Sequence, residues 1–305
     1  MTTTEQTRTP FQERLASVSH AGLALSPREQ TITPELVRWY REVIEDDHPW
    51  YTGPSPFGGP VAPALILHSP TGAGGRNGEW FLKNLYGNLH AKQAWEFFRP
   101  VMVGETVVNR ALVTERYQKR DREFVVCQAS LEDTDGALFA RCTHTQSFLT
   151  DTEQRAVVVD RAKEQQGGRR FDLREGPVLE TLSGPRRVIT EESCNRFTGE
   201  RRNYHNDLDE SKKLGFGEIV VQGTYITCFI SEMMTRRYGE GWFLGGRMAL
   251  TFVNPLWAGE AVQAGGVVRE ITAEGPLRRA QLEVWTAKDD GTRTIVGTAS
   301  ALLTE

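Results

Sequence analysis

The sequence contains two copies of one pattern, and this repeat constrains the fold more than any other feature. Two pairs of segments carry it: FGGPVAPALIL at 57–67 with FGEIVVQGTYI at 216–226, and FFRPVMVGETV at 97–107 with FVNPLWAGEAV at 252–262. A third match joins two Asp-Gly turns, at 135–136 and 290–291. The matches keep one order at offsets of 159, 155 and 155 residues. The chain is therefore predicted to fold as two copies of one unit.

A charged stretch with several glycines separates the two copies. It runs over 150–180 as TDTEQRAVVVDRAKEQQGGRRFDLREGPVLE, a composition typical of a linker on the surface. We place the boundary near Gly168, which predicts one domain at 1–167 and a second at 168–305.

The second copy has the pattern of one long helix followed by antiparallel strands. Apolar residues recur at helical spacing from Ile219 to about Tyr238, after a short helix expected at Ser193–Phe197 and a polar connection over 206–215. Strand-like runs follow at 247–254, 260–272, 278–288 and 293–303. This order predicts an α+β fold with the sheet wrapped around a central helix. In the first copy, SPTGAGGRNG at 69–78 would interrupt the corresponding helix.

Composition excludes several function classes. With 36 Lys and Arg against 40 Asp and Glu, the net charge of −4 provides no field for nucleic acid or an anionic membrane. The uncharged run Ile219–Ser231 is too short to span a bilayer, and the first residues lack the apolar core of a signal peptide. Four cysteines without CxxC spacing favour reduced thiols in a cytoplasmic protein. We expect no metal, because the histidines lack ligand spacing, and no redox cofactor, because no dinucleotide fingerprint is present.

One motif in the second copy points to a family. FTGERRNYHNDLDESKKLGFGEIVVQGTYI at 197–226, followed by LTFVNPLWAGE at 250–260, resembles the MaoC-like hydratase/dehydratase family. Positions that match the family pattern are Gly199, His205, Asp207, Ser211, Phe216 and Gly223. The resemblance implies a double hot-dog fold, in which each of two tandem units is an antiparallel sheet wrapped around a central helix. It also implies hydration of an enoyl thioester, or the reverse dehydration.

The resemblance assigns catalysis to His205, Glu200 and Gly223. His205 and Glu200 would activate one water molecule, with Glu200 standing where the family has an aspartate five residues before the histidine. The backbone N–H of Gly223 would stabilise the thioester oxygen as it gains enolate charge. Each residue also has a purely structural interpretation. His205 would be a surface histidine, Glu200 a member of the charge cluster 200–202, and Gly223 a glycine that permits close packing.

Further residues of the motif are expected to bind the substrate; these are Arg202, Asn203, Tyr204, Phe216 and Gln222. Arg202 and Asn203 replace the Asn-Pro pair of the family, and Gln222 replaces the histidine before Gly223. An arginine offers a planar fork to a substrate carboxylate or a coenzyme A phosphate, although a solvated position is the more common one.

The first copy departs from the motif at each catalytic position. In DDHPWYTGPSPFG at 46–58, Tyr51 aligns with the catalytic histidine and Asp46 with the aspartate, while Ala64 falls at the oxyanion glycine. The domain at 1–167 is therefore predicted to hold a degenerate site, and the domain at 168–305 the active one.

The sequence thus predicts a cytoplasmic hydro-lyase that acts on an acyl thioester of coenzyme A or of an acyl carrier protein, with a homodimer as the expected assembly. Three alternatives stay open: dehydration of an unusual substrate in a specialised pathway, a hot-dog thioesterase, and a non-catalytic partner that binds acyl thioesters. A thioesterase would need an acid or nucleophile on the central helix, where Glu218 and Glu232 are the only acids on or beside it.

Overall fold

A single antiparallel sheet of ten strands forms the frame of the molecule. The structure is a computed structural model that describes residues 10, 20–67, 87–149, 173–199 and 202–304. The first half of the chain supplies β1 (Arg28–Thr31), β2 (Leu89–Phe97), β3 (Thr106–Lys119), β4 (Arg122–Glu132) and β5 (Leu138–Leu149). The second half supplies β6 (Glu180–Val188), β7 (Arg247–Phe252), β8 (Ala261–Glu274), β9 (Leu277–Lys288) and β10 (Arg293–Leu303).

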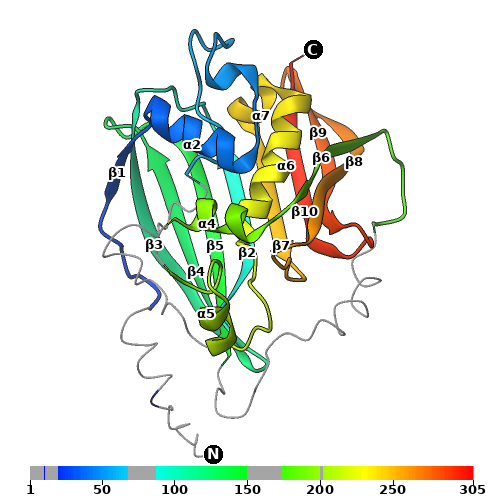
Figure 1. Cartoon of the computed structure of the whole chain (residues 1–305). Coiled ribbons are helices and arrows are strands. Elements are labelled where there is room, and N and C mark those ends of the chain that lie inside the picture. The colour runs from blue at the N-terminus through cyan, green and yellow to red at the C-terminus, as the bar shows by residue number, and fades with distance from the viewer. Residues whose placement is uncertain (1–9, 11–19, 68–86, 150–172, 200–201, 305) are drawn as a thin grey trace, which may run out of the picture.

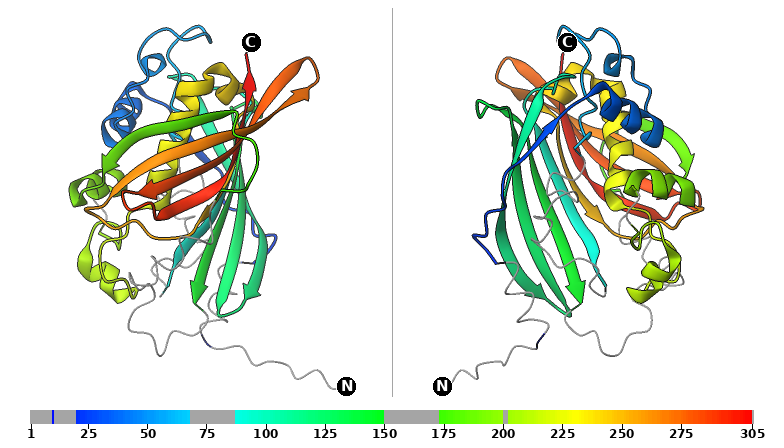
Figure 2. Two further views of the ribbon diagram at one scale, coloured as in Figure 1. Left: turned by 90° about the vertical axis from the view of Figure 1, so that its right-hand side faces the viewer. Right: turned by 60° about the vertical axis from the view of Figure 1, so that its left-hand side comes forward.

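The strand order repeats outward from the centre of the sheet. The order is β1-β3-β4-β5-β2-β7-β10-β9-β8-β6, so each half adds its strands in the same succession from the middle to the edge. Strands β2 and β7 join the halves through an antiparallel ladder that runs from Lys92↔Thr251 to Glu96↔Arg247. The continuous sheet twists strongly and curves around the helices (Figures 1 and 2). The predicted α+β double hot-dog architecture is confirmed.

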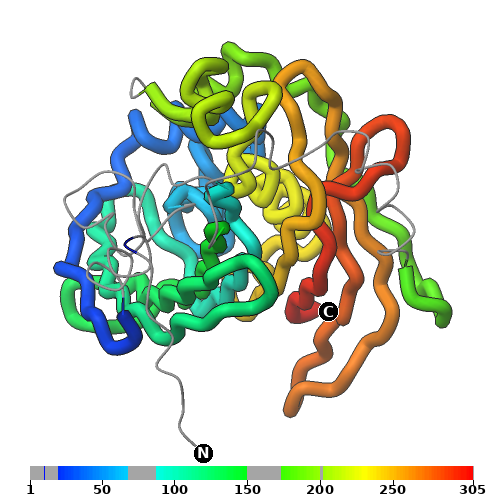
Figure 3. The backbone as a smooth tube through the Cα atoms, turned by 90° about the horizontal axis from the view of Figure 1, so that it is seen from below, coloured from blue at the N-terminus to red at the C-terminus, as the bar shows by residue number. Residues whose placement is uncertain are grey.

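Six helical segments pack on this frame within the described residues. They are α2 (Pro34–Ile44), the 3₁₀ turn η1 (Pro49–Tyr51), α4 (Glu191–Thr198), α5 (Leu208–Lys213), α6 (Gly223–Tyr238) and α7 (Glu240–Gly245). Helix α6 lies near the centre of the molecule when viewed from below (Figure 3). No helix in the described ranges is long and apolar enough to cross a membrane.

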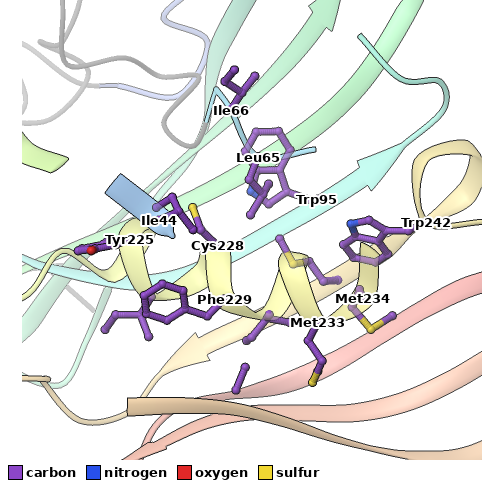
Figure 4. Close-up of a cluster of buried hydrophobic side chains, with 14 of the residues drawn as sticks. Ile44, Leu65, Ile66, Trp95, Tyr225, Cys228, Phe229, Met233, Met234 and Trp242 are labelled. Atoms are coloured by element: carbon purple, nitrogen blue, oxygen red, sulfur yellow. The ribbon is translucent and has the colours of Figure 1, made fainter. Parts of the chain in front are cut away.

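The central helix is largely buried. Twelve of the sixteen residues of α6 are buried, and its apolar side chains pack against both halves of the sheet and against the N-terminal segment (Figure 4). Trp242 of α7 is fully buried and donates its ring N–H to Ser231 of α6 at 3.1 Å. Within the helix only Arg236 and Arg237 are exposed, so the buried polar groups along it require partners inside the protein.

Two sequence expectations need correction. The apolar stretch begins as extended backbone, because Val220 forms a bridge with Trp257 and Val221 donates to the Leu256 carbonyl, so α6 starts at Gly223 rather than Ile219. The segment 206–215 was expected to be a connection but contains α5, because the Asp207 side chain caps the Glu210 amide at 2.9 Å. The predicted interruption at 69–78 lies outside the described residues. In the preceding segment 57–67, which the structure describes, no helix forms.

A buried ion cluster fixes α6 to the N-terminal half. Glu232, almost fully buried, accepts from Arg187 of β6 at 2.8 and 3.1 Å and from Arg236 at 3.1 Å. Arg187 also donates to the carbonyl of Glu45, just after α2, at 2.7 Å. The cluster therefore joins β6, α6 and the end of α2, and loss of one partner would leave a buried charge unpaired.

The close approach of α7 to β10 gives a test of the packing. A Cβ added to Gly241 would lie 1.9 Å from the backbone oxygen of Leu302, which cannot rotate away. We expect Gly241→Ala to lower the free energy of unfolding by about 3 kcal/mol, as overpacking of a core does. Gly217→Ala, where a Cβ meets open space, is the matched control. Urea unfolding of both variants checks this, and equal stability would contradict the packing described.

Candidate active site

His205 lies in the turn between α4 and α5, with a fixed tautomer. Its Nδ1 is 2.7 Å from the backbone oxygen of Val220. A carbonyl oxygen only accepts, so Nδ1 carries the proton and donates it to Val220. The lone pair of Nε2 is therefore the basic position of the ring, the arrangement that a general base needs.

The turn around His205 is rigidly built. The Asn203 side-chain oxygen accepts the His205 amide at 2.9 Å, and the Asn206 side-chain oxygen accepts the Asn203 amide at 2.8 Å. The Tyr204 ring packs on the His205 ring with centroids 3.8 Å apart, and on the buried ring of Phe216 at 5.8 Å. Asn203, Tyr204 and Phe216 thus hold the imidazole in place.

The surroundings keep the imidazole neutral. Burial lowers the pKa of His205 to about 4, although the hydrogen bond to Val220 opposes this shift. At neutral pH the ring is uncharged and its Nε2 is free of a proton. It can therefore accept a proton from water.

The N-terminus of α6 begins near this turn, three residues after Val220. Gly223 is the first residue of the helix, and Gln222 makes no side-chain cap bond to it. In the part of the chain that the structure describes, the amides of Gly223 and Thr224 have no hydrogen-bond acceptor. Two free amides at the positive end of a sixteen-residue helix form a site for developing negative charge.

Gly223 is required by its neighbour Phe252. A Cβ at this position would lie 2.6 Å from the ring of Phe252, the last residue of β7. Only glycine therefore allows the ring to cover the start of the helix at this distance.

Gln222 connects the two elements that carry the motif. Its Nε2 donates to Thr198, at the end of α4, at 3.2 Å, and its Oε1 accepts from Thr224 at 3.4 Å. The Gly199 carbonyl accepts from Asn206 at 3.2 Å. These bonds bring the chain just before residue 200 to the His205 turn. Glu200 itself lies outside the described residues, as does Arg201.

Arg202 forms ion pairs with acidic side chains of its own segment. Its side chain is 62% exposed and forms ion pairs with Asp207 and, at 3.5 Å, with Asp209. The same ion pair lowers the pKa of Asp207, which also caps α5. The role of Arg202 in substrate binding stays a prediction.

The aligned residues of the first copy contact each other directly. The Tyr51 hydroxyl donates to Asp46 at 2.9 Å, and both residues are buried. Burial and the nearby Glu232 raise the pKa of Asp46 to about 6, although Arg236 lies 3.7 Å from its carboxylate. The pair adjoins the buried ion cluster of α6, where it acts as part of the contact between the halves.

The N-terminal half also contributes side chains that sequence reasoning missed. The ring of His90 on β2 stacks on Phe252 with centroids 4.1 Å apart, and on His144 of β5 at 3.9 Å with an interplanar angle of 5°. These histidines showed no metal spacing, and the described residues contain no group of three or more His, Cys, Asp or Glu that would hold a metal. The only sequence signal was the alternation of Cys142, His144 and Gln146 along one strand.

Comparison with known proteins bears on the fold of the whole chain and on one segment of its first half. Residues 19–141 match the family model described as FAS1-like, dehydratase domain region. No curated protein sequence matches the chain. A solved structure titled MaoC-like dehydratase aligns with a TM-score of 0.70 and 15% identity, over 95% of this chain and 99% of the other.

Two further solved structures, from named organisms, are similar to this chain over nearly its whole length. A MaoC-like dehydratase from Phytophthora capsici aligns with a TM-score of 0.67 and 16% identity, over 95% of this chain and 98% of the other. A conserved hypothetical protein from Mycobacterium tuberculosis, described as having a double hotdog fold, aligns with a TM-score of 0.63 and 12% identity over 93% and 96%. These findings confirm the double hot-dog fold that the resemblance implied, the fold of the MaoC-like dehydratases to which the chain is similar.

Proposed function

We propose that the chain adds water to an enoyl thioester, or removes it from a 3-hydroxyacyl thioester. The observation that carries this proposal is the neutral His205, with its basic Nε2, close in the chain to the uncapped N-terminus of α6. A base for water and donors for an oxyanion are the two groups that the reaction requires.

In the hydration direction, Nε2 of His205 takes a proton from water while the oxygen attacks Cβ of the enoyl group. Electrons move through the double bond to the thioester oxygen, where the amides of Gly223 and Thr224 stabilise the enolate. The proton then returns to Cα, which restores the carbonyl and completes the addition of one water. We assign Glu200 to the same water as the second acid/base group, on the strength of the motif alone.

The remaining motif residues position these groups. Asn203, Tyr204 and Phe216 hold the His205 ring, and Gln222 ties α4 to the start of α6. Arg202, exposed beside the turn, is the residue that we assign to an anionic part of the carrier. Coenzyme A or an acyl carrier protein serves as the thioester handle, and a homodimer is the assembly that we propose.

The alternatives receive less support from the geometry. Glu232, the acid on α6 that a thioesterase would use, is committed to ion pairs with Arg187 and Arg236. A binding protein without catalysis would not need a histidine held as a neutral base. A hydro-lyase for an unusual substrate uses the same groups, so it is a variant of the proposal.

Substitution of the two proposed acid/base residues tests the function. Absorbance of the enoyl band of crotonyl-CoA and bulkier enoyl-CoA thioesters should fall with wild type. We expect His205→Ala and Glu200→Gln each to lower kcat by about 10²–10⁴-fold, because each removes a proton-transfer group. His20→Ala, which removes an exposed histidine that bonds only the adjacent carbonyl, is the matched control. Full activity of His205→Ala would overturn the mechanism.

The pH dependence gives a separate test of the histidine. A base works only when it is unprotonated, so a lowered pKa extends its activity to lower pH. We expect kcat/KM for hydration to stay level between about pH 8 and pH 6 and to fall as the pH passes through about 4, where His205 protonates. The same profile is expected in Glu200→Gln with its lower rate. A midpoint near the ordinary histidine value would contradict a buried, neutral base.

A further inference from the structure

A β-bulge in β2 turns His90 toward the inside of the sheet. Gln93 and Trp95 are buried on the inner face of β2, so strict alternation would place residue 90 on the outer face. The pairing of β2 with β5 shifts by one residue between His90 and Lys92. His90 therefore pairs with Gln146 and shares the inner face with it, because a bulge redirects the side chains that precede it.

The ring of His90 stacks on two other rings. It packs on His144 with centroids 3.9 Å apart and an interplanar angle of 5°, and on Phe252 at 4.1 Å and 29°. Two hydrogen bonds orient it: its Nε2 donates to the Lys92 carbonyl at 3.1 Å, and the Gln93 side chain bonds the ring as well. The position and tilt of the His90 ring are therefore set within the N-terminal half.

The ring of Phe252 transmits this support to the start of α6. A Cβ at Gly223 would lie 2.6 Å from Cε1 of Phe252 and 2.9 Å from Cδ1, so the edge of the ring rests on the first residue of the helix. Groups packed this closely do not shift independently of each other. A change in the tilt of Phe252 would therefore move Gly223 and the amides at the helix N-terminus with it.

The segment that follows β7 also sets the position of the proposed base. Val220 forms a bridge with Trp257, and the Val220 carbonyl is the acceptor 2.7 Å from Nδ1 of His205. Burial lowers the pKa of His90 well below its ordinary value, and the charges of His144 and His205 lower it further. His90 is thus a neutral ring within electrostatic reach of the base.

We propose that His90 is a positioning residue for the hydration reaction: its ring holds Phe252 against Gly223 and thereby fixes the amides that take up the enolate charge. The inference rests on the proposed function and adds to it a residue from the opposite half of the chain. His90 needs no contact with the substrate for this role. A donor that is displaced by about 1 Å can lower the rate by about 10²-fold, so the support of a single ring affects the rate measurably.

Substitutions at His90 test the proposal against a purely structural role. We expect His90→Ala to lower kcat for the best enoyl-CoA substrate by about 10–10²-fold with KM within about threefold of wild type, because the amides act mainly in the transition state. His90→Phe restores a flat ring that transfers no proton, and it should recover most of the lost kcat. The control is Lys92→Ala, which removes an exposed side chain on the opposite face of the same strand.

A double substitution shows whether His90 acts through Phe252. Phe252→Leu removes the ring that rests on Gly223 and should lower kcat to a similar extent. We expect the double variant of His90→Ala and Phe252→Leu to be no slower than Phe252→Leu alone, because both changes break one chain of contacts. Additive losses, an unchanged kcat in His90→Ala, or an equal loss in His90→Phe would overturn the proposal. If His90→Ala does not fold, His90→Gln, which keeps a polar group without a ring, takes its place.

Binding measurements separate this inference from the proposed function. Calorimetry compares butyryl-CoA with S-butyl-CoA, a thioether of equal length that lacks the thioester oxygen. Wild type should bind the thioester about tenfold more tightly through the helix amides, and His90→Ala should bring this ratio to about one. That result without turnover of any enoyl thioester would count against the hydratase function and support the positioning of the amides by His90. The same ratio in His90→Ala as in wild type would overturn the inference.

Discussion

The burial of most of α6 is the constraint from which the rest of the structure follows. A helix that is buried along most of its length must find partners for its buried polar groups inside the protein, and each partner ties another element to it. Glu232 is paired with Arg187 and Arg236, which ties β6 and the end of α2 to the helix. The first amides of the helix have no such internal partner, and they lie where the motif places the thioester oxygen. The buried helix thus carries an ion cluster in its second half and uncapped amides at its N-terminus.

Much of the second copy could be predicted from the sequence because its signals are local. The strand patterns gave the four strands after α6 to within about two residues, since alternation along a strand reports its own burial. The start of α6 was placed four residues early, because Val220 and Val221 are apolar for a different reason: they pair with the 256–257 segment. The helix α5 was missed because its residues are polar and only the Asp207 cap marks it.

The parts of the site that could not be predicted depend on contacts between the halves. The motif indicated His205 and Gly223, but nothing in it pointed to Val220 as the acceptor that fixes the tautomer. The contact of His90 with Phe252 follows from the register between β2 and β7, which join segments more than 150 residues apart in sequence. A pairing of that kind is set by the packed sheet as a whole and leaves no local pattern.

The two copies share one frame but differ at the aligned positions of the motif. In the N-terminal copy, Asp46 and Tyr51 bond to each other and adjoin the ion cluster of α6, so this pair stabilises the contact between halves. The inner face of the same copy still contacts the other half, because His90 of β2 stacks on Phe252, the residue that covers Gly223. Strand β2 of this copy pairs with β7 of the other at the centre of the sheet, so a change in one copy is transmitted directly to the frame of the other.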